Sequence, residues 1–119
     1  MSAGVRWNLA RAEDVPVDDD WLAGEERSVL AKLTIAKRRA DWRLGRWVAK
    51  TLIAEVLGTP AHRVVIRAAD DGAPEAFVDG AASGLSLSLS HRDGVAVAAI
   101  TALPSSVGIA TMSASDGIV

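Results

Sequence analysis

Residues 85–109, LSLSLSHRDGVAVAAITALPSSVGI, predict a buried β-hairpin. Leucine and serine alternate up to residue 90, which places the leucines on one face of a strand and the hydroxyls on the other. His91 ends this run, and we expect it on the hydroxyl side, where the chain turns. The turn is Arg-Asp-Gly at residues 92–94, because an Asp-Gly pair tolerates positive φ. Residues 95–102 are apolar and partly β-branched, so they predict a returning strand with at least one buried face.

The composition is that of one soluble domain. The chain has 119 residues, of which 50% are hydrophobic and 24% charged, and these values are ordinary for a globular protein with a single core. It has no cysteine, which excludes disulfides and thiolate metal sites. No apolar run reaches the length of a membrane span, so we expect a cytoplasmic protein without a membrane partner. The net charge of −2 argues against a nucleic-acid partner.

Basic residues are concentrated in the second quarter of the chain. Residues 1–26 hold seven acids and two arginines, whereas residues 27–50 hold eight Lys or Arg and a single Asp. The spacing predicts one helix over residues 21–33 and a second over residues 35–57, capped by Thr34 and ended by Gly58. Gly45 lies inside the second helix, where it costs about 1 kcal/mol relative to Ala.

The second helix has a basic face and an apolar face. At about 100° per residue, the apolar side chains fall opposite the basic ones and predict a core contact. The basic face has almost no acidic neighbour at i±4, so we interpret it as a site for a phosphate-bearing ligand, which Gly45 would allow to come close. The alternative is a solvated basic face without a ligand. The basic residues are Arg39, Arg43, Arg46 and Lys50, and the apolar ones are Leu44, Val48, Leu52 and Val56.

The remaining segments predict short strands. Residues 64–66 and 76–78 are apolar and flank the turn sequence DDGAP, which predicts an antiparallel pair. Residues 5–9 alternate like an edge strand, residues 107–109 start a further strand, and residues 110–119 read as a tail. The predicted fold is therefore α+β, with a long helix packed on a small antiparallel sheet.

Four segments occur in an order that resembles a known family. They are RRADWRLGRWVAK (38–50), GAP (72–74), SLSHRDGVAVAAI (88–100) and VGI (107–109). Together they resemble the N-terminal half of the two-domain 4′-phosphopantetheinyl transferases, over about residues 26–109. By this resemblance residues 1–109 form one half of a pseudo-dimer. The family moves phosphopantetheine from coenzyme A to a serine of an acyl or peptidyl carrier protein, with magnesium.

The resemblance also implies a set of coenzyme A contacts. Arginines of the long helix would contact phosphates, the GAP segment would shape the nucleotide loop, and the Ser-His pair would bind the 3′-phosphate and the diphosphate. These contacts would be charge-assisted hydrogen bonds to a highly anionic ligand. The residues are Arg38, Arg46, Lys50, Gly72, Pro74, Ser90 and His91.

The chain departs from the family after residue 109. The family follows VGI with Asp-x-Glu, two carboxylates that bind magnesium, whereas this chain has Ala110 and Met112. The family's second half, which carries a catalytic lysine in a W-x-x-K-E-A pattern, is missing from the sequence. We therefore expect a truncated member with no metal site and no catalytic residue, inactive alone. The sheet that the second half would cover predicts self-association. The alternatives are a non-catalytic module that binds coenzyme A or phosphate, and a degenerate product without function.

Overall fold

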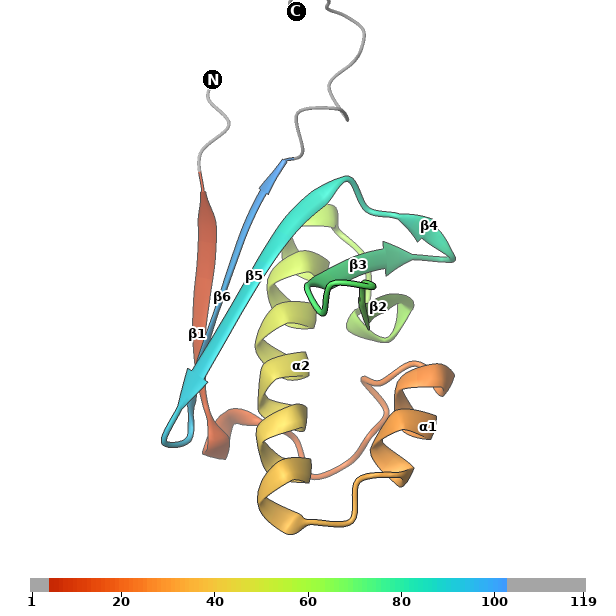
Figure 1. Cartoon of the computed structure of the whole chain (residues 1–119). Coiled ribbons are helices and arrows are strands. Elements are labelled where there is room, and N and C mark those ends of the chain that lie inside the picture. The colour runs from red at the N-terminus through yellow and green to blue at the C-terminus, as the bar shows by residue number, and fades with distance from the viewer. Residues whose placement is uncertain (1–4, 103–119) are drawn as a thin grey trace, which may run out of the picture.

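The computed structural model describes residues 5–102 and confirms the α+β architecture. A long helix, α2, lies across one face of a three-stranded antiparallel sheet, and a second three-stranded antiparallel sheet lies beside it (Figure 1). The elements are β1 (Arg6–Arg11), α1 (Gly24–Ala31), α2 (Ala36–Leu57), β2 (Val64–Ala68), β3 (Pro74–Val78), β4 (Ala81–Ala82), β5 (Leu85–Arg92) and β6 (Val95–Ala102), with short 3₁₀ turns at Ala12–Asp14 and Ala61–Arg63.

The predicted hairpin is formed by β5 and β6. Arg92 pairs with Val95, so the loop has only two residues, Asp93 and Gly94, and both have positive φ, 52° and 79°. That conformation matches the twist of the two strands. The expectation that His91 lies with the hydroxyls is wrong. Side chains alternate strictly along a strand, and His91, two residues after Leu89, points to the face that α2 covers.

The core lies between α2 and the sheet of β1, β6 and β5. Leu44, Val48 and Leu52 are buried as predicted, and Val56 packs against the same cluster. Two of the facing positions of β6 are small: the alanines at 96 and 98 are no more than 1% exposed. Small side chains there let the helix approach the strand closely, which is the close packing typical of protein interiors.

The helix boundaries differ in part from the prediction. α2 ends at Gly58, which has a φ of 67°, as expected for a C-terminal glycine. It begins after Ile35, which makes no side-chain cap, so the predicted cap by Thr34 is wrong. α1 is shorter than residues 21–33, because the chain enters the helix only after Ala23, whose N–H donates to Glu26 Oε1 at 2.9 Å.

β1 is an edge strand, as predicted, in the sheet order β1-β6-β5. Two of its amides donate to side chains: Leu9 N–H to Asn8 Oδ1 at 2.9 Å and Arg11 N–H to Asp14 Oδ2 at 2.8 Å. These bonds satisfy backbone donors that would otherwise be open to another strand.

The face of this sheet opposite α2 carries apolar side chains. Trp7 is 65% exposed and Leu9 42%, and Leu9 lies across from Val97, which is only partly buried. Within residues 5–102, α2 is the α-helix that packs on this sheet, and it covers the other face (Figure 1).

The second sheet has the order β2-β3-β4, which confirms the predicted antiparallel pair and adds the two-residue strand β4. The strand expected at 107–109, the domain boundary at 109 and the tail at 110–119 lie outside the described residues. None of the described helices combines the length and the apolar character that crossing a membrane requires.

Candidate anion-binding pocket

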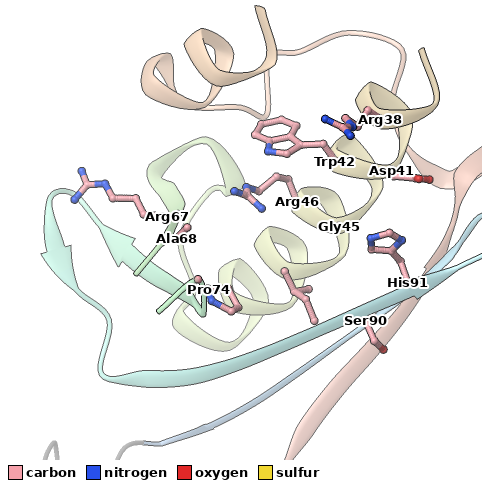
Figure 2. Close-up of a pocket in the computed structure, with 12 residues that line it drawn as sticks. Arg38, Asp41, Trp42, Gly45, Arg46, Arg67, Ala68, Pro74, Ser90 and His91 are labelled. Carbon is pink, nitrogen blue, oxygen red and sulfur yellow. The ribbon is translucent and has the colours of Figure 1, made fainter. Parts of the chain in front are cut away.

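A cavity of about 480 Å³ lies between α2, the connection from β2 to β3, and the end of β5. Each of these elements contributes one wall (Figure 2). Arginines and an indole come from the helix, a tight turn from the β2–β3 connection, and an imidazole from β5. The lining residues are Arg38, Asp41, Trp42, Gly45, Arg46, Arg67, Ala68, Gly72, Pro74, Leu89, Ser90 and His91.

The fold brings six of the seven predicted contact residues to this one pocket. Arg38 and His91, the most distant of them, lie 53 positions apart in the sequence, and the three walls contain three of the four family-like segments described above. Lys50 is the exception: its side chain is fully buried and bonds Glu26. The ligand contacts assigned to these residues stay predictions.

Arg46 is the half-buried cation of the pocket. Its guanidinium carbon lies 4.8 Å from the centre of the Trp42 ring, a cation–π contact that fixes the side chain. Its Nε is buried and has no hydrogen-bond partner within residues 5–102. Burial lowers the pKa of Arg46, an effect that Glu26 opposes. An unsatisfied, desolvated guanidinium N–H is a strong donor for an anion.

The mouth of the pocket carries Arg38 and Asp41. Arg38 is exposed and, in the described part of the chain, forms no salt bridge. The Asp41 carboxylate accepts a hydrogen bond from Lys37 Nζ at 2.8 Å, and this bond lowers the pKa of Asp41, to which the charge of His91 adds. Lys37 therefore partly neutralises Asp41, the one acid among the described residues that line the pocket.

Ser90 and His91 lie next to each other on β5, and their side chains leave the strand on opposite faces (Figure 2). His91 points toward α2, near Gly45 and Asp41, whereas the Ser90 hydroxyl points away. Of this predicted pair, the imidazole is the side chain that faces the pocket.

Two glycines shape the walls. Gly72 has a φ of 86° in the turn between β2 and β3, where Ala69 N–H donates to Ala73 O at 2.7 Å and Gly72 N–H to Ala69 O at 2.8 Å. A residue with a side chain would be strained there. Gly45 is helical, and a Cβ added to it meets no atom within 4 Å. Its missing side chain leaves open space on the helix wall.

The residues of the basic face of α2 have two different roles: Arg46 lines the pocket, whereas the other three bond groups elsewhere in the chain. Arg39 donates to the carbonyls of Leu30 and Leu33 at 2.7 and 2.9 Å, and Arg43 bonds the carboxylate of Asp19. The prediction that this face lacks internal partners is therefore wrong for Arg39, Arg43 and Lys50. Asp19 and Glu26 each lie 24 residues from the base they pair with, beyond any i±4 comparison.

Arg67 is a lining residue that the sequence reasoning missed. Its guanidinium forms a two-pronged pair with Glu25, at 2.7 and 2.8 Å, and lies 4.5 Å from the centre of the Phe77 ring. Figure 2 shows it pointing away from Arg46. The predicted strand ends at residue 66, whereas β2 runs to Ala68, so the strand prediction stopped one residue short of Arg67.

The described residues offer no cluster of three or more His, Asp or Glu side chains that could hold a metal ion. Magnesium takes a nearly octahedral set of oxygen ligands, usually including one or two carboxylates. Among the residues between positions 5 and 102, the pocket lining supplies one carboxylate, Asp41, and Lys37 is bonded to it.

A comparison with protein families identifies the chain. A model of the 4′-phosphopantetheinyl transferase N-terminal domain matches residues 25–101. The chain belongs to this family. The match covers α1, α2 and the strands from β2 to β6, and so includes every wall of the pocket. No curated protein sequence matches the chain significantly.

Solved structures share the fold over nearly their whole length. A holo-(acyl-carrier-protein) synthase from Bacillus anthracis, in complex with CoA (3′,5′-ADP), is 21% identical with a TM-score of 0.69, over 84% of this chain and 95% of that one. The synthase from Neisseria meningitidis is 18% identical with a TM-score of 0.67, over 86% and 98%. The synthase from Mycobacterium tuberculosis is 23% identical with a TM-score of 0.59, over 86% and 98%.

Replacing Gly45 by Ala should raise the free energy of unfolding by about 1 kcal/mol, because the new methyl enters open space and glycine is a poor helix former. Replacing Gly58 by Ala is the matched control. Its Cβ also meets open space, but its φ of 67° should make the same methyl destabilising, by about 1–2 kcal/mol. Denaturant unfolding of both variants measures the difference. A destabilised Gly45→Ala protein would contradict the open helix wall.

Proposed function

We propose that this chain binds coenzyme A in the pocket between α2, the β2–β3 turn and β5. The observation that carries the proposal is Arg46, a half-buried arginine that lines a cavity large enough for a nucleotide and whose Nε has no partner within residues 5–102. Membership of the transferase family supports it, as does the CoA (3′,5′-ADP) in the Bacillus synthase of the same fold.

Each wall contributes a different interaction to this binding. Arg46, fixed by Trp42, donates to a phosphate from inside the pocket, and Arg38 attracts the ligand at the mouth. His91 donates from the opposite wall. The turn at Gly72 and Pro74 confines the nucleotide, and bare Gly45 leaves room for it against the helix. Lys50 is buried against Glu26 and is not placed to reach this ligand.

We further propose that the chain alone does not carry out the family's transfer to a carrier protein. The family reaction uses magnesium, and the sequence has Ala110 and Met112 where the family has the two metal-binding carboxylates. The described residues provide no replacement cluster. Binding of coenzyme A without turnover is also what the alternative, a non-catalytic module, requires.

We also propose, from the family membership, that the partner of this chain is a carrier protein and that its location is cytoplasmic.

Replacing Arg46 by Ala should weaken coenzyme A binding by about 1.5–3 kcal/mol, the range for a hydrogen bond to a charged group. Isothermal titration calorimetry measures this difference. Arg63→Ala is the control, because Arg63 is half exposed and pairs with Asp79 outside the pocket, and its affinity should match that of the unaltered chain. Absence of saturable heat with the unaltered chain would contradict the proposal.

The chain should not modify a carrier protein, with or without magnesium. Transfer requires charge on the diphosphate to be neutralised and a proton to be removed from the acceptor serine. Intact-mass spectrometry of an acyl carrier protein incubated with coenzyme A and the chain tests this, with a holo-(acyl-carrier-protein) synthase as the positive control. A mass increase above the reaction without the chain would show that the metal ligands have been misassigned.

The open face of the sheet should cause self-association. Trp7→Lys, which places a charge on that face at a position 65% exposed, should lower the apparent mass in light scattering with little loss of stability. Val17→Lys is the control, because Val17 is fully exposed but lies outside the sheet. A concentration-independent monomer in the unaltered chain would exclude this association. The apolar residues of the face are Trp7, Leu9, Val95, Val97 and Ala99.

A further inference from the structure

A buried carboxylate lies behind the pocket. Glu26 is 2% exposed and Lys50 is fully buried, and Lys50 Nζ donates to Glu26 Oε1. The same oxygen accepts the Ala23 N–H at 2.9 Å, and Oε2 accepts the Ile66 N–H at 3.0 Å. Both oxygens of Glu26 are therefore used by donors from the start of α1, from α2 and from β2. A buried carboxylate is stable only when it is satisfied in this way.

Arg46 lies one helical turn before Lys50, so the two basic side chains share one side of α2. All three groups influence one another: burial lowers the pKa of both Arg46 and Lys50, the charge of Glu26 opposes this shift in each, and the charge of Arg46 adds to it in Lys50. One carboxylate therefore faces two cations in a region from which water is largely excluded. Lys50 makes the hydrogen bond, and in the described part of the chain Arg46 Nε is left without a partner.

We propose that Lys50 is a positioning residue, which occupies Glu26 and thereby keeps Arg46 free for a phosphate in the pocket. The inference rests on the proposed function, because it assigns Lys50 an effect on binding through Arg46. Without the ammonium group, the Glu26 carboxylate would lack its charged partner. The long side chain of Arg46, one helical turn away, could then leave its contact with Trp42 and take the place of the ammonium group, and its Nε–H would gain a bond. The pocket would then lose its buried cation to an internal ion pair.

This role differs from the one that the family resemblance suggests for Lys50. A lysine that contacts the phosphates directly contributes its own charge, so its removal weakens binding whatever residue stands at position 26. A lysine that only occupies Glu26 becomes dispensable once Glu26 is neutral. The two roles therefore predict opposite results for a chain in which both members of the pair are uncharged.

The experiment measures coenzyme A affinity by calorimetry for four variants whose folding is checked by thermal unfolding. They are Lys50→Met, Arg46→Met, the two combined, and Glu26→Gln combined with Lys50→Met. Lys50→Met and Arg46→Met should each raise Kd by at least about tenfold, the loss expected for one charged hydrogen bond. The combination should bind no more weakly than Arg46→Met alone, because the two changes act through the same guanidinium.

The chain with Glu26→Gln and Lys50→Met should bind coenzyme A with a Kd within about threefold of the unaltered one, because no carboxylate remains to capture Arg46. This variant also keeps the test decisive if Lys50→Met alone fails to fold, because it leaves no unpaired buried charge. A Kd at least about tenfold weaker in the double variant would show that Lys50 contacts the ligand, and would overturn the inference. Unchanged affinity in Lys50→Met would also overturn it, whereas unchanged affinity in Arg46→Met would overturn the proposed function itself.

Discussion

The carboxylate of Glu26 is the interaction on which the arrangement of this chain depends. It is the only described acid that is almost completely buried, and it joins the first turn of α1, the middle of α2 and the second strand. β2, and with it the turn from β2 to β3 that forms one wall of the pocket, is therefore held to α1 and α2 by this polar contact. The apolar core between α2 and the sheets holds the same elements together. Breaking such a contact by removing one partner leaves a buried charge, which is strongly unfavourable. The position of the β2–β3 wall relative to α2 follows from that constraint.

α2 combines the two functions of the molecule in one element. Its buried side, with Leu44, Val48 and Leu52, packs on the sheet, and its other side supplies the arginines and the indole of the pocket. Where a helix serves both as core and as wall, small residues are needed, either its own or its neighbour's, wherever another group approaches closely. Gly45 on the wall and the alanines of β6 under the core side meet that requirement in the same way.

Local patterns predicted most of the fold, and contacts between distant segments explain what they missed. The β5–β6 hairpin, the length of α2 and its end at Gly58 all follow from residues within a few positions of one another. The pairs of Lys50 with Glu26 and of Arg43 with Asp19 do not, because each joins residues 24 apart on separate elements. A scan along one helix therefore counted as free two bases that the fold pairs with carboxylates, and a third, Arg39, that bonds backbone carbonyls. Six of the seven residues that the family resemblance suggested line one pocket. The side of β5 on which His91 lies could have been predicted from the sequence, because it follows from the alternation of side chains along the strand.

The amides of β1 that bond Asn8 and Asp14 decide how copies of this chain can meet. A strand added to that edge would have to displace both side chains, so extension of the sheet from molecule to molecule is disfavoured. Contact through the broad face that carries Trp7 involves no such displacement. A face that meets its own copy about a two-fold axis closes on itself, whereas strand-to-strand addition has no natural end. The hydrogen bonds of two small side chains therefore favour a finite assembly over a growing filament.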